Sequence, residues 1–61
     1  MRTICVIIED TIENYEIIKK IENDFPCFTN YEMKENGYME LSIQCRQEDA
    51  GAIERVFASL V

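Results

Sequence analysis

Apolar and polar positions along this chain recur with two different periods, and these periods predict five structural elements. The stretch 3–8 is rich in β-branched residues and ends at the polar pair Glu9-Asp10, a pattern typical of a strand. Within 11–24 the apolar residues recur at steps of three and four, as they do on one face of a helix. Two further strands, 27–35 and 38–45, and a second helix, 47–60, complete the pattern. We therefore expect one α+β domain covering residues 1–61.

The ends and buried faces of the two helices follow from the same pattern. Asp10 and Glu13 have the D-x-x-E spacing of a capping box, so the first helix should begin near Thr11. Pro26 should end it, because the residue before a proline is pushed towards extended geometry. Its expected apolar stripe is Ile12, Tyr15, Ile17, Ile18, Ile21 and Phe25, and that of the second helix is Ala50, Ile53, Val56, Phe57 and Leu60. Gly51 either permits close helix packing or lies in the first turn, where a glycine is tolerated.

The Asn36-Gly37 pair between the second and third strands is the strongest short signal for a hairpin. A two-residue loop would set polar side chains of the second strand opposite the apolar face of the third. A three-residue loop, 35–37, keeps that face apolar, so we expect this loop, with a type I turn and Gly37 in the left-handed conformation. The expected pairs are Met33–Met39, Tyr31–Leu41, Thr29–Ile43 and Cys27–Cys45. The same register sets Glu32 against Glu40, an unfavourable like-charge pair.

Strand–helix–strand–strand–helix is the beginning of the ferredoxin-like split β-α-β arrangement. Right-handed crossover predicts a two-layer sandwich, in which an antiparallel sheet of order 1-3-2 has both helices on one face. No fourth strand is expected, which leaves the apolar strand 3–8 at an edge. Exposed apolar edges are normally covered, so we expect a homodimer through this strand, or alternatively its pairing with a strand of another protein.

Charge narrows the range of partners. Twelve acidic residues face six basic ones, a net charge of −6. Such a surface repels nucleic acid and anionic membranes and favours a basic protein partner, although solubility alone also accounts for it. No apolar run approaches the roughly 20 residues that span a bilayer, and the N-terminus lacks a signal-peptide cleavage pattern. We therefore expect a cytoplasmic protein that binds neither membrane nor nucleic acid directly.

The chain offers few residues for chemistry. Cys5, Cys27 and Cys45 form no C-x-x-C pair, and histidine is absent, so zinc is not expected. Small buried thiols in a reducing compartment are the favoured interpretation, although Cys5 on an edge strand could also form an intermolecular disulfide. The acids Glu9, Asp10 and Glu13 match no calcium loop. With no nucleophile beside a base, we expect neither enzymatic activity nor a cofactor.

The face of the sheet that the helices leave open is the expected binding surface. Its predicted partner-binding residues are Thr3, Cys5, Ile7, Phe28, Glu32, Tyr38 and Glu40. Aromatic sheet faces can stack RNA bases, but acids stand here where phosphate binding needs basic residues. The first hypothesis is therefore a small acidic, dimeric interaction protein that regulates or inhibits a basic, nucleic-acid-binding partner. Its size and charge are typical of phage or mobile-element inhibitors.

Three features of the chain resemble those of a known family. They are the order of elements, the stretch N-G-Y-M-E-L-S-I-Q-C that enters the third strand, and the acidic start of the second helix at Glu48-Asp49. The chain resembles small ferredoxin-like regulatory modules of the ACT and RAM type. That resemblance implies dimerisation through edge strands or sheet faces and binding of a small ligand, such as an amino acid, at the interface. It supplies the alternative hypothesis, a stand-alone ligand-sensing regulatory domain, and no binding residue is carried over from the family.

Overall fold

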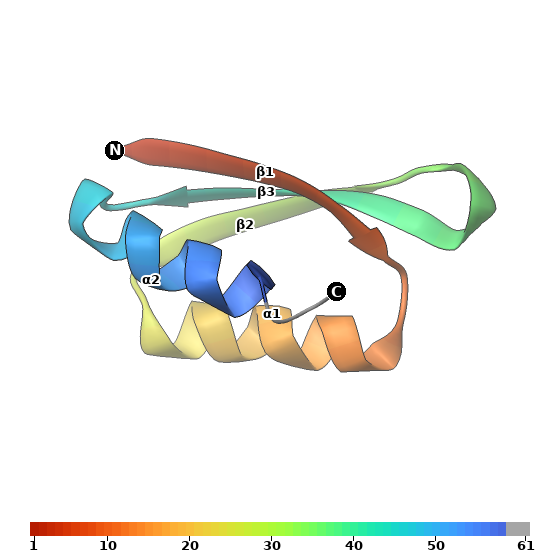
Figure 1. Cartoon of the computed structure of the whole chain (residues 1–61), viewed down its shortest axis with the longest axis horizontal. Coiled ribbons are helices and arrows are strands. Elements are labelled where there is room, and N and C mark those ends of the chain that lie inside the picture. Colours follow the sequence, from red (N-terminus) through yellow and green to blue (C-terminus); the bar gives the residue numbers. More distant parts are fainter. Residues whose placement is uncertain (59–61) are drawn as a thin grey trace.

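The computed structural model describes residues 1–58 and shows a sheet lying on two helices (Figure 1). In chain order the elements are β1 (Arg2–Glu9), α1 (Ile12–Asp24), β2 (Cys27–Met33), a short 3-10 turn (Glu35–Gly37), β3 (Tyr38–Cys45) and α2 (Gln47–Ala58). Element types and order match the sequence expectation, and the boundaries of elements that end within residues 1–58 agree to within two residues. The predicted last part of the second helix, 59–60, lies outside the described residues.

The sheet has the order β1-β3-β2 and is antiparallel throughout, as expected. Both helices lie against the same face of it, with α1 contacting β2 and α2 contacting β1 (Figure 1). This is the α+β arrangement that the sequence predicts. Within residues 1–58, β1 and β2 each pair only with β3, so each has one open edge.

The hairpin register is the predicted one. Each of the four expected β2–β3 pairs is present, including Cys27 opposite Cys45 and Met33 opposite Met39. The side chains of β3 that face the helices are buried almost completely: Met39, Leu41, Ile43 and Cys45. Together with Ile4 of β1 and the helix residues Ile18, Ile21, Ala50, Ile53 and Phe57 they form the core. Alternating polarity in β3 therefore decided both the register and the buried face.

The turn itself differs from the expectation. Gly37 is left-handed, with a φ of 77°, but Asn36 is left-handed as well, with φ 61° and ψ 28°. A type I turn would hold only Gly37 in that region, so the type I prediction is wrong. Asn36 adopts this conformation readily because asparagine is among the non-glycine residues that tolerate it best. The backbone N–H of Tyr38 closes the turn by donating to the Glu35 carbonyl.

The start of α1 also corrects the sequence analysis. Thr11, and not Asp10, is the N-cap: its Oγ1 accepts a hydrogen bond from the backbone N–H of Asn14 at 3.2 Å. Ile12, expected in the apolar stripe, is 75% exposed, whereas Asn14 is buried. The helix is therefore rotated so that a polar residue of its first turn faces the protein interior.

Gly51 has no close-packing role. It is exposed, and a Cβ added to it would meet nothing within 4 Å. Its position in the first turns of α2 explains why it is tolerated there. The stripe of α2 is otherwise as expected for Ala50, Ile53, Val56 and Phe57, while Leu60 lies outside the described residues.

Candidate functional site

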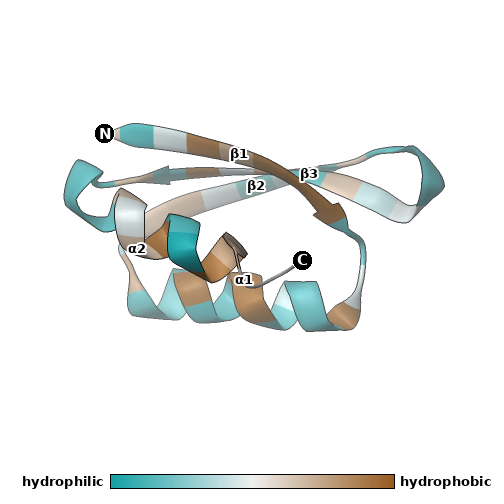
Figure 2. Cartoon of the chain, viewed as in Figure 1, coloured by the Kyte–Doolittle hydropathy of each residue, from teal (hydrophilic) through white to brown (hydrophobic). Residues whose placement is uncertain are grey.

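The face of the sheet opposite the helices has no layer covering it in the described part of the chain (Figure 2). All seven residues predicted to bind a partner lie on this outer face. Six are exposed and Glu40 is half-buried; the seven are Thr3, Cys5, Ile7, Phe28, Glu32, Tyr38 and Glu40. Their placement agrees with the sequence analysis, and their role in binding stays a prediction.

The strand registers divide these residues between two ends of the face. At one end Ile7 lies opposite Glu40, and Tyr38 lies opposite Glu9, so Ile7 and Tyr38 are diagonal neighbours on β1 and β3. Their exposed fractions are 66% and 43%. At the other end Thr3 and Phe28 both flank Gln44. The structure therefore separates Phe28 from the other two large apolar residues of the outer face.

Acidic side chains gather around Ile7 and Tyr38. The loop after β1 is held against the hairpin, because the backbone N–H of Asp10 donates to the Gly37 carbonyl at 2.8 Å. One hollow beside this contact is lined by Ile7, Tyr38, Glu9 and Glu13, and a second by Ile7, Tyr38, Lys34 and Glu35. We call this region the acidic end: Ile7 and Tyr38 with Glu9, Asp10, Glu13, Glu32, Glu35 and Glu40. Within 7–13 and 32–40, the stretches that carry these residues, Lys34 is the one basic residue and belongs to the acidic end as well.

Lys34 lies between Glu32 and Glu40, the two like charges that the register pairs. Its Nζ lies 3.7 Å from Oε2 of Glu32 and 3.6 Å from Oε1 of Glu40. An ammonium between two carboxylates offsets their repulsion, although each exposed ion pair contributes only about 0–1 kcal/mol. The side-chain alternation of β2 could have indicated this, because Lys34 follows Glu32 by two positions on the same face.

Asn14 holds the loop that carries Glu9 and Asp10, and the sequence analysis missed it. Its Nδ2 donates to the Glu9 carbonyl at 2.8 Å, and that carbonyl also accepts from the Thr11 backbone N–H at 3.0 Å. This part-buried hydrogen bond from the side chain of Asn14 stabilises the turn from β1 into α1. The spacing of Thr11 and Asn14, three residues apart at a helix start, was the available signal.

Tyr15 connects the acidic end to β2. Its ring packs edge-on against that of Tyr31, with centroids 5.5 Å apart and planes at 72°. A hydrogen bond with Asp10, partial removal from water and the charge of Asp10 raise the pKa of Tyr15 to about 12. The neutral phenol therefore donates to the Asp10 carboxylate.

The raised pKa predicts a loss of stability in alkali. In an unfolded chain a tyrosine ionises near pH 10. The stabilisation from Tyr15 should therefore be complete below about pH 10 and disappear as the pH rises towards about 12, the pKa of the folded protein. A tyrosinate absorbance titration should show a late transition that Tyr15→Phe removes and Asp10→Asn moves to lower pH. An unchanged late transition in Tyr15→Phe, with circular dichroism showing a folded protein, would contradict the assignment.

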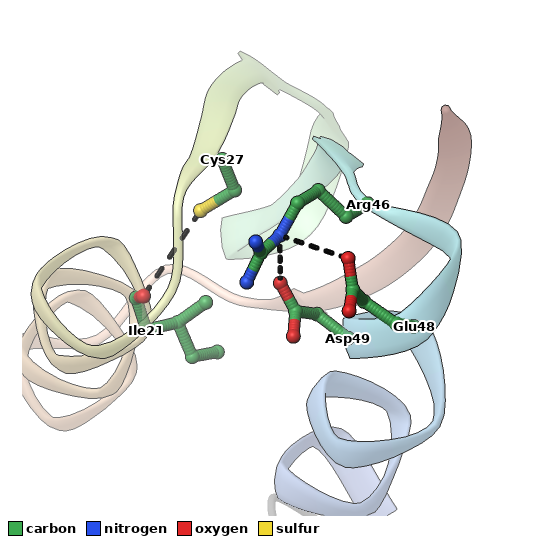
Figure 3. A network of polar contacts seen from close by, with 5 residues as sticks. All are labelled: Ile21, Cys27, Arg46, Glu48 and Asp49. Atoms are coloured by element: carbon green, nitrogen blue, oxygen red, sulfur yellow. Dashed lines mark hydrogen bonds and ion pairs between the residues drawn. The ribbon is translucent and has the colours of Figure 1, made fainter.

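The three cysteines differ in how far they are buried. Burial, then the charge of Glu22, raises the pKa of Cys27, and its Sγ lies 4.0 Å from the Ile21 carbonyl (Figure 3). Cys45 is buried, and all three cysteines are free thiols. Cys5 corrects the expectation of small buried thiols, because it is exposed on the outer face, with its Sγ 3.6 Å from Oγ of Ser42. The β1 strand is covered on one face only, which leaves every second residue of it open.

The opposite end of the molecule has a different electrostatic character. Nε of Arg46 lies 2.9 Å from Oδ2 of Asp49 and 3.6 Å from Oε1 of Glu48 (Figure 3). The Asp49 hydrogen bond and both carboxylates raise the pKa of Arg46. Arg2 similarly pairs with Glu54 at 2.9 Å. These three acids of α2 thus have arginine partners, whereas the ion pairs of the acidic end within residues 1–58 are those with Lys34.

Residues 1–58 contain no group of three or more cysteine or acidic side chains arranged to hold a metal ion. Over the same residues, neither helix is long and apolar enough to cross a membrane. Comparison of the chain with protein-family models, with curated proteins and with solved structures finds no match.

Proposed function

We propose that this domain is a protein-binding module that regulates or inhibits a basic partner by covering the partner's positive surface with its acidic end. The observation that carries the proposal is the exposure of Ile7 and Tyr38 side by side, with acidic residues around them. Protein interfaces commonly combine a central aromatic or apolar contact with a polar, charged rim. A tyrosine at the centre and carboxylates at the rim match that anatomy.

The charge of the rim favours a basic partner over a neutral one. Six acids and one lysine occupy the acidic end, and that lysine is already engaged by Glu32 and Glu40. Such a field accelerates encounters with a positive surface and rejects negative ones. The same field disfavours nucleic acid as the direct ligand, so a nucleic-acid-binding protein is the partner class that fits best.

Quantitative affinity capture with paired variants tests the proposal. Wild-type protein should retain a basic protein from a source-cell lysate. Raising the ionic strength from about 0.1 M to about 1 M should release it, because the Debye length falls from about 10 Å to about 3 Å. Tyr38→Ala should weaken retention about tenfold or more, as expected for a residue at the centre of an interface. Glu9→Gln/Glu35→Gln should slow association.

The matched control is Glu16→Gln/Glu22→Gln, which removes the same charge from exposed positions of α1. It should leave retention unchanged. Equal loss of binding in both double variants would show that net charge alone is responsible and would refute a site at the acidic end.

A further inference from the structure

The backbone of β1 has one side paired with β3 and one side open. The Asp10 N–H donates to the Gly37 carbonyl, so Asp10 and Gly37 form one further hydrogen-bonded pair beyond the Glu9–Tyr38 pair of the β1–β3 register. Even-numbered residues of β1 therefore direct their N–H and C=O groups towards β3, since these directions alternate along an antiparallel strand. Thr3, Cys5 and Ile7 therefore direct their backbone N–H and C=O groups to the open edge.

The two open edges of the sheet differ in how well they resist pairing. Edge strands are normally protected by charged residues or proline. β2 carries a charge, Glu32, within the strand, whereas the charges of β1, Arg2 and Glu9, lie at its two ends and the stretch 3–8 between them contains neither a charge nor a proline. β1 is thus the edge that is open to a further strand.

We propose that a second copy of this chain pairs with this edge, β1 antiparallel to β1, with Val6 on the twofold axis. In this register Ile4 lies opposite Ile8 of the partner subunit, and Val6 lies opposite Val6 of the partner subunit. Arg2 is brought towards Asp10 of the partner subunit, and the symmetric contact repeats this attraction at the other end. The apolar positions and the opposite charges of β1 are therefore complementary to themselves, as a twofold interface requires.

The alternative register, with Cys5 on the axis, fits less well. It sets Arg2 opposite Ile8 of the partner subunit and gives Asp10 no basic counterpart. The Val6 register also covers the inner-face side chains along the open edge of β1. Val6 and Ile8 are half-buried in the single chain, and Ile4 of the partner subunit would lie beside Ile8 and complete their burial.

The dimer leaves the proposed binding face available. A twofold axis perpendicular to a continuous six-stranded sheet keeps both outer faces on one side and all helices on the other. The inference goes beyond the proposed function, because the pairing of β1 uses backbone groups and inner-face side chains, and Asp10 is the one residue of the acidic end that it engages.

Sedimentation equilibrium at micromolar concentration tests the association. Wild-type protein should have twice the mass of the 61-residue chain. Val6→Lys should make it largely monomeric, because two lysines would then lie opposite each other on the twofold axis. Thr29→Lys is the matched control, since Thr29 is half-buried like Val6 and lies on the same face of the opposite edge strand, where it pairs with Ile43; it should stay dimeric. A monomeric wild type, a dimeric Val6→Lys, or species that grow beyond a dimer would overturn the proposal.

Cysteine pairing tests the register. In a Cys5→Ser background, Val6→Cys places two thiols opposite each other in a non-hydrogen-bonded pair. The Cα atoms of such a pair are about 4.5 Å apart, within disulfide range. Mild oxidation should therefore give a covalent dimer, while Ile8→Cys in the same background should not, because it faces Ile4 of the partner subunit. The reverse result, or an efficient Cys5–Cys5 bond in the wild type, would overturn the Val6 register. Circular dichroism of each variant confirms its fold.

Discussion

Leu41→Ala should lower the free energy of unfolding by about 3–5 kcal/mol, the usual range for truncating a fully buried leucine. Leu41 has an exposed fraction of 0% and lies in the central strand, between Val6 of β1 and Tyr31 of β2. At about 0.05–0.15 kcal/mol per residue, a chain of 61 residues has only roughly 3–9 kcal/mol of stability in total. Urea denaturation should therefore show a variant that is close to unfolded at room temperature.

Ile12→Ala is the control for this prediction, because it removes a similar apolar side chain that the sequence pattern had placed in the core. Ile12 is 75% exposed, so the expected change is within about 0.5 kcal/mol, and alanine favours the helix slightly more than isoleucine does. Equal destabilisation by the two substitutions would show that the first turn of α1 is packed differently from the structure described.

Asn14→Ala should lower the free energy of unfolding by about 0.5–1.5 kcal/mol, the net contribution of a typical hydrogen bond. The substitution removes the Nδ2 donor from the Glu9 carbonyl, a bond of 2.8 Å, while the Thr11 N–H continues to donate to that carbonyl. Asn14→Asp should be worse and pH-dependent. Its carboxylate would face a carbonyl, so the new carboxyl should have a raised pKa, and stability should fall further as the pH rises through it.

Asn23→Ala is the matched control, because Asn23 is an exposed asparagine on the same helix. It should leave stability almost unchanged. Hydrogen exchange of the Asp10 amide gives a second readout: its bond to Gly37 should open more often in Asn14→Ala, since the loop loses an anchor. If protection at Asp10 were the same in Asn14→Ala and wild type, the loop would not depend on Asn14.

The hairpin shows how far sequence reasoning can reach. Only one loop length keeps the apolar residues of β3 opposite the apolar residues of β2, and the structure has that register throughout. A one-residue slip would turn the whole apolar set towards solvent, so the pattern is decisive. The turn angles of Asn36 were not determined in the same way, because several turns satisfy a three-residue loop.

The start of α1 shows where periodicity fails. Hydrophobic spacing treats every isoleucine as inward-facing, and Ile12 fits the stripe as well as Ile18 does. In the first turn the inward position is taken by Asn14, whose Nδ2 donates to the Glu9 carbonyl from within the protein. A buried asparagine cannot be distinguished from an exposed one by pattern alone, because its partner is a backbone group elsewhere in the fold.

The sequence by itself determined the five elements, the sheet order, the hairpin register and the identity of the outer face, because each depends on side-chain alternation or on short connections. Only the tertiary structure decided the register of β1 against β3, which joins residues more than 28 positions apart. A shift of two residues would preserve the alternation of both strands and so leave the sequence pattern equally satisfied. That register places Ile7 beside Tyr38, and the contact of Asp10 with Gly37 gathers acids from three segments around them. The acidic end is therefore a product of long-range pairing, which no local pattern encodes.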